Sequence, residues 1–450
     1  MTSSGKRFED CTDEELVAEL ARRRGARGPV DMSAMEDALD AAQLQDRRCM
    51  LDTYVARQVA TQDDQPKPCP RCGQPARVRA RDRSRTVRTV SGTYTIRRHQ
   101  HYCASCQHGF YPLDDALGLP DEGEVIAYME RRVFDFGVNE PFAQAAARWN
   151  VHYPVPISDG LVRAVVDRVG RRAEGAEGAA LQQKLRASPA TPSALVVVQT
   201  DGSMVPTRGD QAWREAKLAV LYRAEHHVRG ESGLRGQLTE ARYVAVLGSQ
   251  DEFRPALDTG LQAERVEAAA TVAWLGDGAA GNWTLADELC PHAVQILDWV
   301  HVTEHASDGG KAVLGDTDPL VAVWQRSIEG RLWQGDVATV CEELTACMVG
   351  ATAAQREALE GLHRYYSTNA ARMRYAEFRE RDLPIGTGTV ESGHRHVLQD
   401  RMKRSGQHWD VVHGHRLVQL RAAYKTAGPE RIYAAIHTAP RRTPQQGRAA

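Results

Sequence analysis

A series of short apolar runs between residues 194 and 297 constrains the fold of this chain more than any other feature. Runs of this length, rich in β-branched residues, are typical of buried strands, and helix-like stretches at about 252–263 and again after residue 277 separate the later ones. Three strands, a helix, a strand, a short helix and a last strand is the order of a ribonuclease H-like sheet. The predicted strands are residues 194–200, 216–222, 243–247, 271–275 and 294–297.

The rest of the 450-residue chain falls into helical and β-prone stretches around this sheet. Apolar residues recur at helical spacing in three further regions, whereas residues 66–119 form short β-prone pieces with turn signals such as Ser91-Gly92. We therefore expect a multidomain α/β protein. Its predicted parts are a helical arm (1–65), a zinc-ribbon-like β module (66–120), a helical region (121–186), a ribonuclease H-like core (187–302 and 383–426), an all-helical insertion anchored by Trp324 and Trp333 (303–382), and a tail (427–450) that is disordered from Ala439.

Two helix-like runs in the region 121–186 have the layout of a helix-turn-helix. Phe142–Trp149 precedes a short connection, and Ser158 stands as an N-cap before a second run that reaches Val169. Most helical hairpins bind no DNA, so a DNA-binding pair and an ordinary pair of helices both stay open.

Composition favours a cytoplasmic protein. With 42% hydrophobic residues and no apolar run near the ~18 residues that span a membrane, we expect buried cores and no membrane span. The N-terminus lacks the apolar core of a secretory signal, so the nine cysteines are expected as thiols or metal ligands rather than disulfides. The net charge of -2 argues against a uniformly basic nucleic-acid binder and leaves local basic patches to decide.

Three acidic residues stand at positions suited to metal-dependent chemistry. Asp201 and Asp277 each close a strand-like run and precede a glycine, and Glu391 is expected in the first turn of a helix after Gly386-Thr-Gly388. Hard cations such as Mg²⁺ take oxygen ligands and leave room for phosphate, so these carboxylates predict a two-metal phosphoryl-transfer site. Taken singly, ordinary Asp-Gly turns and a charged, solvated helix explain each of them as well.

Asp298 is a rival for the second aspartate. It follows the strand that ends at Leu297, and His301 stands three residues further on. We interpret Asp298 and His301 as active-site support, neighbours that orient the core or approach phosphate. A helix-capping aspartate with a hydrogen-bonded histidine is the alternative.

Two C-x₂-C motifs predict a structural Zn²⁺ site between Cys69, Cys72, Cys103 and Cys106. Two such knuckles bring four thiolates into a tetrahedron, and the metal can fold a module too small to hold itself. Arginines crowd the chain between the knuckles, and a second basic set follows Glu391. Both sets would neutralise DNA phosphates, with a solvated basic surface as the alternative. The residues concerned are Arg77, Arg79, Arg81, Arg83, Arg85, Arg97 and Arg98 in the ribbon, and Arg395, Arg401, Lys403 and Arg404 after Glu391.

Several sequence segments, taken together, resemble those of bacterial insertion-sequence DDE transposases of the ISKra type. The resemblance runs from about Cys69 to Tyr424, and the string around Glu391 is its most specific part. One departure is Gly393-His-Arg-His396, where Cys and Lys are expected in many relatives. The strings are Thr200–Arg208, Trp213–Lys217, Leu275–Ala279, Ile296–His301, Leu383–Ser392, Arg401–Gly406 and Trp409.

The resemblance implies that Asp201, Asp277 and Glu391 hold two Mg²⁺ or Mn²⁺ ions in a ribonuclease H-like core. Water would nick the transposon end, and the released 3′-hydroxyl would attack target DNA. The expected partners are double-stranded transposon-end and target DNA and further copies of the chain, as a homodimer or higher oligomer, in the bacterial cytoplasm near the nucleoid. A ribonuclease H-like nuclease or resolvase without strand transfer, and a non-mobile DNA-binding protein, are the alternatives.

Overall fold

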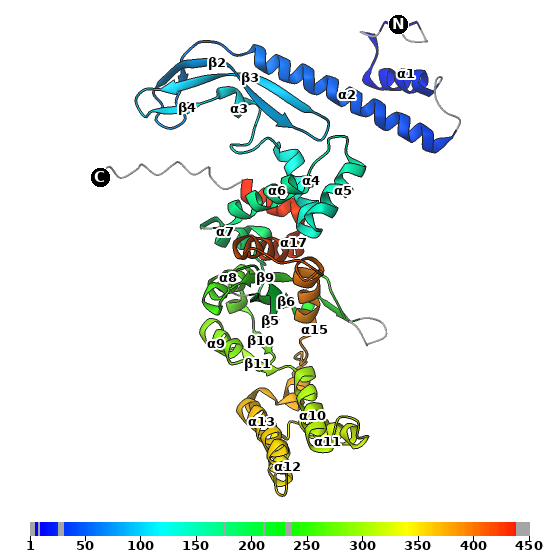
Figure 1. Ribbon diagram of the computed structural model, residues 1–450, viewed down its shortest axis with the longest axis vertical. Coiled ribbons are helices and arrows are strands. Elements are labelled where there is room, and N and C mark those ends of the chain that lie inside the picture. Colours follow the sequence, from blue (N-terminus) through cyan, green and yellow to red (C-terminus); the bar gives the residue numbers. More distant parts are fainter. Residues whose placement is uncertain are drawn as a thin grey trace. The chain divides into compact units, whose positions relative to one another are not determined.

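The structure is a computed structural model that describes residues 5–7, 10–25, 31–174, 176–209, 212–229 and 236–437 (Figure 1). The chain forms two compact units. One takes in the described residues up to Arg132 together with Ala146–Ile157, and the other takes in Val133–Ala145 and the described residues from Ser158 to His437. No helix in the described ranges is both long and apolar enough to cross a lipid bilayer.

Two helices begin the first unit, as the periodicity predicted. α1 spans Asp13–Gly25 and α2 spans Met32–Ala60. Val55 and Val59, near the end of α2, pack against a small core of the following β module, so this helix is held by its last turns. That core consists of Val87, Ile96, Leu113 and Leu119.

The β module is a four-stranded antiparallel sheet in the order β1-β2-β3-β4. A long hairpin dominates it, and its strands turn at Ser91-Gly92, where the sequence predicted the turn. A short helix, α3 (Pro112–Ala116), follows the sheet. The strands are β1 (Lys67–Pro68), β2 (Pro75–Arg88), β3 (Thr93–Cys103) and β4 (His108–Phe110).

The region after the β module is helical, as expected. Ser158 caps α6 through its hydroxyl, which accepts a hydrogen bond from the Leu161 amide at 3.2 Å, so the predicted N-cap is confirmed. Whether α5 and α6 act as a DNA-binding pair stays a prediction. The helices are α4 (Ala127–Asn139), α5 (Phe142–His152), α6 (Asp159–Ala173) and α7 (Ala176–Leu185).

The second unit is built on a mixed five-stranded sheet in the order β11-β10-β5-β6-β9. β11, β10 and β5 run parallel, whereas β6 is antiparallel to both β5 and β9. The predicted succession of strands and helices is confirmed, with an additional small hairpin, β7 (His227–Arg229) and β8 (Gly236–Leu238), between β6 and β9. The sheet strands are β5 (Leu195–Pro206), β6 (Trp213–Arg223), β9 (Arg242–Leu247), β10 (Thr271–Gly276) and β11 (Val294–Leu297).

One strand differs from its prediction. We expected the first strand to stop before Asp201, but β5 continues through Asp201 to Pro206 and pairs with β6 over its whole length. Gly202 therefore serves no turn. A Cβ at Gly202 would lie 2.1 Å from the Glu215 carboxylate, so the missing side chain makes room for the neighbouring strand's glutamate.

Helices cover this sheet. α8 (Gln250–Glu264) packs against β6 and β9, α9 (Ala280–Leu289) against β10, and α17 (Val411–His437) against β9 (Figure 1). α17 is two helices joined at a kink, where Gly428 has φ +75° and Pro429 follows. The predicted tail thus contains this kink and the second helix, which runs on to His437, and the residues from Ala439 onward lie outside the described ranges.

The chain between β11 and residue 382 is helical, as expected, and its standing as a separate insertion stays a prediction. The Trp324 indole donates a hydrogen bond to the Ala306 carbonyl at 3.2 Å, and Trp333 packs edge-on against Trp299. Both tryptophans therefore link helices of the insertion, as expected. The helices are α10 (Trp299–Leu314), α11 (Leu320–Trp333), α12 (Val337–Cys347), α13 (Ala353–Asn369) and α14 (Tyr375–Glu380).

Candidate functional site

The sheet register brings three aspartates to one level. β10 pairs in parallel with β5, with Leu275 opposite Gln199, and with β11, with Gly276 opposite Leu297. Continuing these registers sets Asp277 level with Asp201 on one side and with Asp298 on the other. Neighbouring strands lie about 4.8 Å apart, so Asp277 and Asp298 follow the carboxyl ends of β10 and β11 at the level of Asp201, which lies within the longer β5.

Asp201 faces a cavity and contacts a histidine. Its Oδ1 accepts the Gly202 amide at 2.7 Å, and its Oδ2 lies 3.1 Å from Nε2 of His394. Burial alone would raise the pKa of Asp201, but the close His394 ring, the Gly202 amide and the charge of His301 outweigh it and lower that pKa below its usual value. Asp201 is therefore held as a carboxylate.

Asp277 occupies the turn after β10, as predicted. Its Oδ1 accepts hydrogen bonds from the Ala279 amide at 3.0 Å and from the Asn282 side chain at 2.9 Å. Gly278 adopts φ +97°, a conformation that favours glycine. Both hydrogen bonds end on Oδ1, so they orient the Asp277 side chain without using Oδ2.

Glu391 lies in the short helix α15 (Gly388–Gly393), which packs against β5 and β6. It is exposed and lines a cavity of about 530 Å³ together with Asp201. A buried glutamine explains how two residues so far apart in sequence meet there. The Gln199 amide donates to the Gly386 carbonyl at 3.1 Å, and its Oε1 accepts from the Val390 amide at 3.0 Å.

Asp298 differs from Asp201, Asp277 and Glu391 in its burial and in the number of hydrogen bonds that it accepts. It is fully buried, caps α10, and its two oxygens accept three hydrogen bonds: from the Thr387 amide at 2.7 Å, the His301 amide at 2.9 Å and His301 Nδ1 at 2.7 Å. Burial would raise the pKa of Asp298, but these donors outweigh it and lower that pKa. Asp298 and Gln199 therefore both form hydrogen bonds to the backbone of the loop that precedes Glu391.

The contact with Asp298 also shifts the pKa of His301. Its hydrogen bond to Asp298, together with the charges of Asp298, Asp277 and Glu304, raises the pKa of His301 to about 9 although burial opposes the change. At neutral pH the ring is therefore a cation beside Asp298. The helix-capping aspartate with a hydrogen-bonded histidine is therefore present, and active-site support by Asp298 and His301 stays a prediction.

The four cysteines form the tightest ligand cluster in the described parts of the chain. Their sulfur atoms all lie within 4.8 Å of one another, with Cys69 and Cys106 3.6 Å apart and Cys72 and Cys103 3.5 Å apart. Tetrahedral Zn–S bonds of about 2.3 Å require sulfur separations of about 3.8 Å, so the cluster fits Zn²⁺. By contrast, Asp201, Asp277 and Glu391 do not form such a cluster among the described residues.

The backbone of each knuckle positions its cysteines and changes the pKa of their thiols. Gly73, with φ +74°, turns the first knuckle, and its amide donates to the Cys69 carbonyl at 2.8 Å. In the second knuckle the Cys106 amide and neighbouring groups lower the pKa of the Cys103 thiol to about 6, whereas burial and the neighbouring thiols raise the pKa of Cys106. The cysteines could therefore hold a structural zinc between the two ends of the hairpin.

The arginines of the β ribbon divide into exposed and engaged residues. Arg85 and Arg98 both pair with Asp114, and the Arg98 guanidinium lies 3.7 Å above the Tyr111 ring. These two therefore hold the module together. The other predicted contacts are exposed, although Arg81 pairs with Asp64 at 2.8 Å; they are Arg77, Arg79, Arg81, Arg83 and Arg97.

The basic residues after Glu391 also divide, and one expectation needs correction. Arg401 is completely buried, donates to the Gly137 carbonyl at 3.3 Å and lies over the rings of Phe142 and Trp409. Burial lowers its pKa to about 9. In this structure Arg401 braces the helical packing and cannot reach DNA.

The other three residues of this set remain accessible. Arg395 and Arg404 are exposed, and Lys403 donates to the Ser203 hydroxyl at 2.5 Å, two residues along β5 from Asp201. Arg395 therefore lines the cavity with Asp201 and Glu391, and Lys403 bonds to Ser203, which lines it as well.

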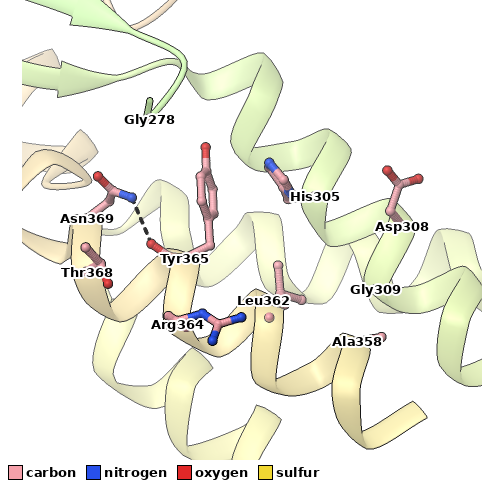
Figure 2. Close-up of a pocket in the computed structure, with 11 residues that line it drawn as sticks. Gly278, His305, Asp308, Gly309, Ala358, Leu362, Arg364, Tyr365, Thr368 and Asn369 are labelled. Atoms are coloured by element: carbon pink, nitrogen blue, oxygen red, sulfur yellow. Dashed lines mark hydrogen bonds between the residues drawn. The ribbon is translucent and has the colours of Figure 1, made fainter. Parts of the chain in front are cut away.

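A second cavity opens beside the Asp277 turn. It measures about 560 Å³ and lies between α10 and α13 (Figure 2). Figure 2 shows Tyr365 pointing from α13 toward Gly278, with His305 on the facing helix. The Tyr365 hydroxyl donates to the Asp277 carbonyl at 3.0 Å, and its ring lies 4.1 Å from that of His305. The insertion thus braces the turn that carries Asp277.

Sequence reasoning missed three residues around the site: Gln199, Tyr365 and His394. Gln199 could have been noticed, because a fully buried amide in an apolar strand needs partners, and it precedes Asp201 by two residues on the same strand face. Nothing local marks Tyr365, whose partner lies 88 residues away. His394 stood in the sequence only as a departure from the family pattern.

Comparisons with known proteins add little to this geometry. No protein-family profile matches the sequence, and no curated protein matches it. Among solved structures, the chain is similar to one from the Drosophila P element transposase strand transfer complex, with a TM-score of 0.33, 11% sequence identity, and coverage of 65% of this chain and 91% of that chain. A likeness this slight supports no conclusion about fold or function.

Proposed function

We propose that this protein is a metal-dependent DNA transposase that cleaves transposon ends and joins them to target DNA. The observation that carries the proposal is the meeting of Asp201 and Glu391 at one cavity, with Asp277 level with Asp201 on the next strand. Asp201 and Glu391 come from distant parts of the chain, and Asp277 follows the end of a parallel strand, the place where ligands bind in α/β folds. The sequence resemblance to ISKra-type transposases agrees with this arrangement.

The sheet order supports a ribonuclease H-like core. β5 is central, Asp201 lies on it, and β10 delivers Asp277 beside it. With this core we also propose the domain division given by the sequence, including the catalytic segments 187–302 and 383–426 around the insertion.

The acidic residues fit two divalent metal ions by their chemistry. Carboxylate oxygens suit Mg²⁺ or Mn²⁺, and Asp201 is held ionised. Asp201, Asp277 and Glu391 would hold these ions, which when bound polarise the phosphate and stabilise charge on the attacking and leaving oxygens. We favour Asp277 over Asp298 as the second aspartate, because three donors already occupy the oxygens of Asp298.

The chain's own residues would orient the reacting strands. Gln199 and Asp298 fix the loop ahead of Glu391, and Lys403 and Arg395 supply positive charge beside the cavity. Exposed ribbon arginines such as Arg77 and Arg83 would neutralise phosphates of the transposon end. We propose double-stranded DNA and at least one further copy of the chain as partners, because two ends must be paired.

The test is cleavage and strand transfer of a labelled transposon end with Mg²⁺ or Mn²⁺ in the full chain. Asp201→Ala, Asp277→Ala and Glu391→Ala should abolish both products while DNA binding persists. Full activity in Asp277→Ala with none in Asp298→Ala would reverse our choice of second aspartate. Cleavage without any joined product would favour a nuclease or resolvase.

A further inference from the structure

A buried histidine faces the cavity beside Asp201, which its Nε2 approaches to 3.1 Å, and its Nδ1 has no partner among the described residues. His394 is only 3% exposed, and neither ring nitrogen makes a well-aligned hydrogen bond within the described residues, although Nε2 lies close to Asp201 Oδ2. It lines the same cavity as Asp201 and Glu391. Leaving a buried polar atom unpaired costs about 1 to 3 kcal/mol, so a histidine in this state indicates a ligand or an unseen partner.

The contact between His394 and Asp201 has the spacing of two ligands on one cation. Nε2 lies 3.1 Å from Asp201 Oδ2, yet the ring N–H direction does not meet the requirements of a hydrogen bond to that oxygen. Two ligand atoms that bind one metal ion at right angles, each at about 2.1 Å from it, lie about 3.0 Å from each other. A cation shared by the two atoms would account both for this spacing and for the poorly aligned N–H.

The local helix aligns His394 with Glu391. The two residues are three positions apart, a spacing that sets side chains on one helix face, and a π-helical segment (His394–Gln399) begins at the histidine. Such segments are frequent at functional sites. Gly393 allows the close approach, because a Cβ there would lie 3.1 Å from the side chains of Leu218 and Val220 on β6.

We propose that His394 is a metal ligand that shares a divalent cation with Asp201, and that Glu391 completes the set by rotation of its exposed side chain. This rests on the proposed two-metal function and adds a nitrogen ligand to a site expected to hold only oxygens. Imidazole is a good ligand for transition metals and a poor one for Mg²⁺. The site should therefore prefer Mn²⁺ to Mg²⁺, and that preference should depend on His394.

The test is pulsed electron paramagnetic resonance of Mn²⁺ bound to the zinc-loaded full chain without DNA. The wild-type protein should show nitrogen coupling from a bound imidazole, with the change in pattern expected when its histidines carry ¹⁵N. His394→Gln should remove this coupling and lower the ratio of Mn²⁺ to Mg²⁺ affinity about tenfold or more, by analogy with losses at metal sites whose supporting groups are changed. His396→Gln is the matched control, because His396 lines the same cavity and is exposed; it should change neither quantity.

The outcomes separate this inference from the proposed function. Absence of nitrogen coupling in the wild-type protein, or its survival in His394→Gln, overturns the role of His394, and the wild-type measurement decides even if the variant fails to fold. If strand transfer still requires Asp201 and Glu391 in that case, the transposase proposal stands. Mn²⁺ binding that is unchanged in Asp201→Asn would refute both.

Discussion

Replacing Asp298 with Asn should weaken the protein in a pH-dependent way. The substitution keeps the shape of a fully buried side chain but removes the charge that faces His301 and one acceptor that the three donors require. His301 then loses the main reason for its elevated pKa. The perturbation therefore acts on a defined ion pair at the edge of the candidate site.

The magnitude follows from the two pKa values of His301. At 1.36 kcal/mol per pKa unit, the rise from 6.5 to about 9 corresponds to about 3 kcal/mol. The side chain is 36% exposed, so solvent screening reduces the expected contribution to about 1 to 2 kcal/mol. A further loss of about 1 to 3 kcal/mol, independent of pH, should come from buried donors left without an acceptor.

The direction with pH is fixed by linkage. A raised histidine pKa contributes fully below about pH 6.5, the unfolded value, and its contribution disappears as pH rises through about 9. The lowered pKa of Asp298 contributes above about pH 3.9 and is lost as pH falls below that value. The difference between wild type and Asp298→Asn should thus be largest between about pH 4 and 6.5 and shrink toward pH 10.

The assay is urea unfolding at several pH values, with the His301 titration followed by NMR. Asp308→Asn on the same helix is the control and should change the free energy of unfolding by less than about 0.5 kcal/mol, because Asp308 is exposed and its ion pair with Lys311 lies at the surface. A difference between wild type and Asp298→Asn that stays constant from pH 6 to 10, or grows above pH 9, would refute the reasoning.

Three further predictions concern other parts of the molecule. Metal analysis should find one zinc ion per chain, and Cys69→Ser with Cys103→Ser should lose the ion and unfold the β module; a folded, zinc-free module by circular dichroism and hydrogen exchange would contradict this. Gln199→Leu should lower strand transfer at least tenfold and the free energy of unfolding by about 2 to 4 kcal/mol, because the Gly386 carbonyl and Val390 amide lose their partner; unchanged activity would exclude its positioning role. Arg401→Met should alter stability without changing the salt dependence of DNA binding, because Arg401 is buried. Arg83→Ala should instead reduce the slope of that dependence by about one. The reverse pattern would show that Arg401, and not Arg83, contacts DNA phosphates.

Much of the fold was predictable because its signals are local. The apolar runs that became β9, β10 and β11 end within a residue or two of their predicted bounds, since turn residues follow each of them. The cysteine motifs needed only their spacing. The turn at Asp277 also followed its local signal, an Asp-Gly pair after a buried strand, although the same signal at Asp201 produced no turn.

The remaining features depend on partners distant in sequence. β5 continues past Asp201 because β6 pairs with it up to Trp213, which a local Asp-Gly signal cannot reveal. Arg401 appeared to be one of a run of surface cations until the rings of Phe142 and Trp409 enclosed it. The loop before Glu391 likewise depends on Gln199, nearly two hundred residues earlier.

The most direct test of the central claim uses a pre-cut transposon end and a target plasmid. With Mg²⁺ or Mn²⁺, the wild-type chain should join an end that carries a 3′-hydroxyl and fail with a matched 3′-deoxy end, and Asp201→Asn should bind both ends but join neither. Joining of the 3′-deoxy end, joining in the presence of a chelator that removes divalent ions, or full activity of Asp201→Asn would contradict a carboxylate-held metal site that directs a hydroxyl at phosphate.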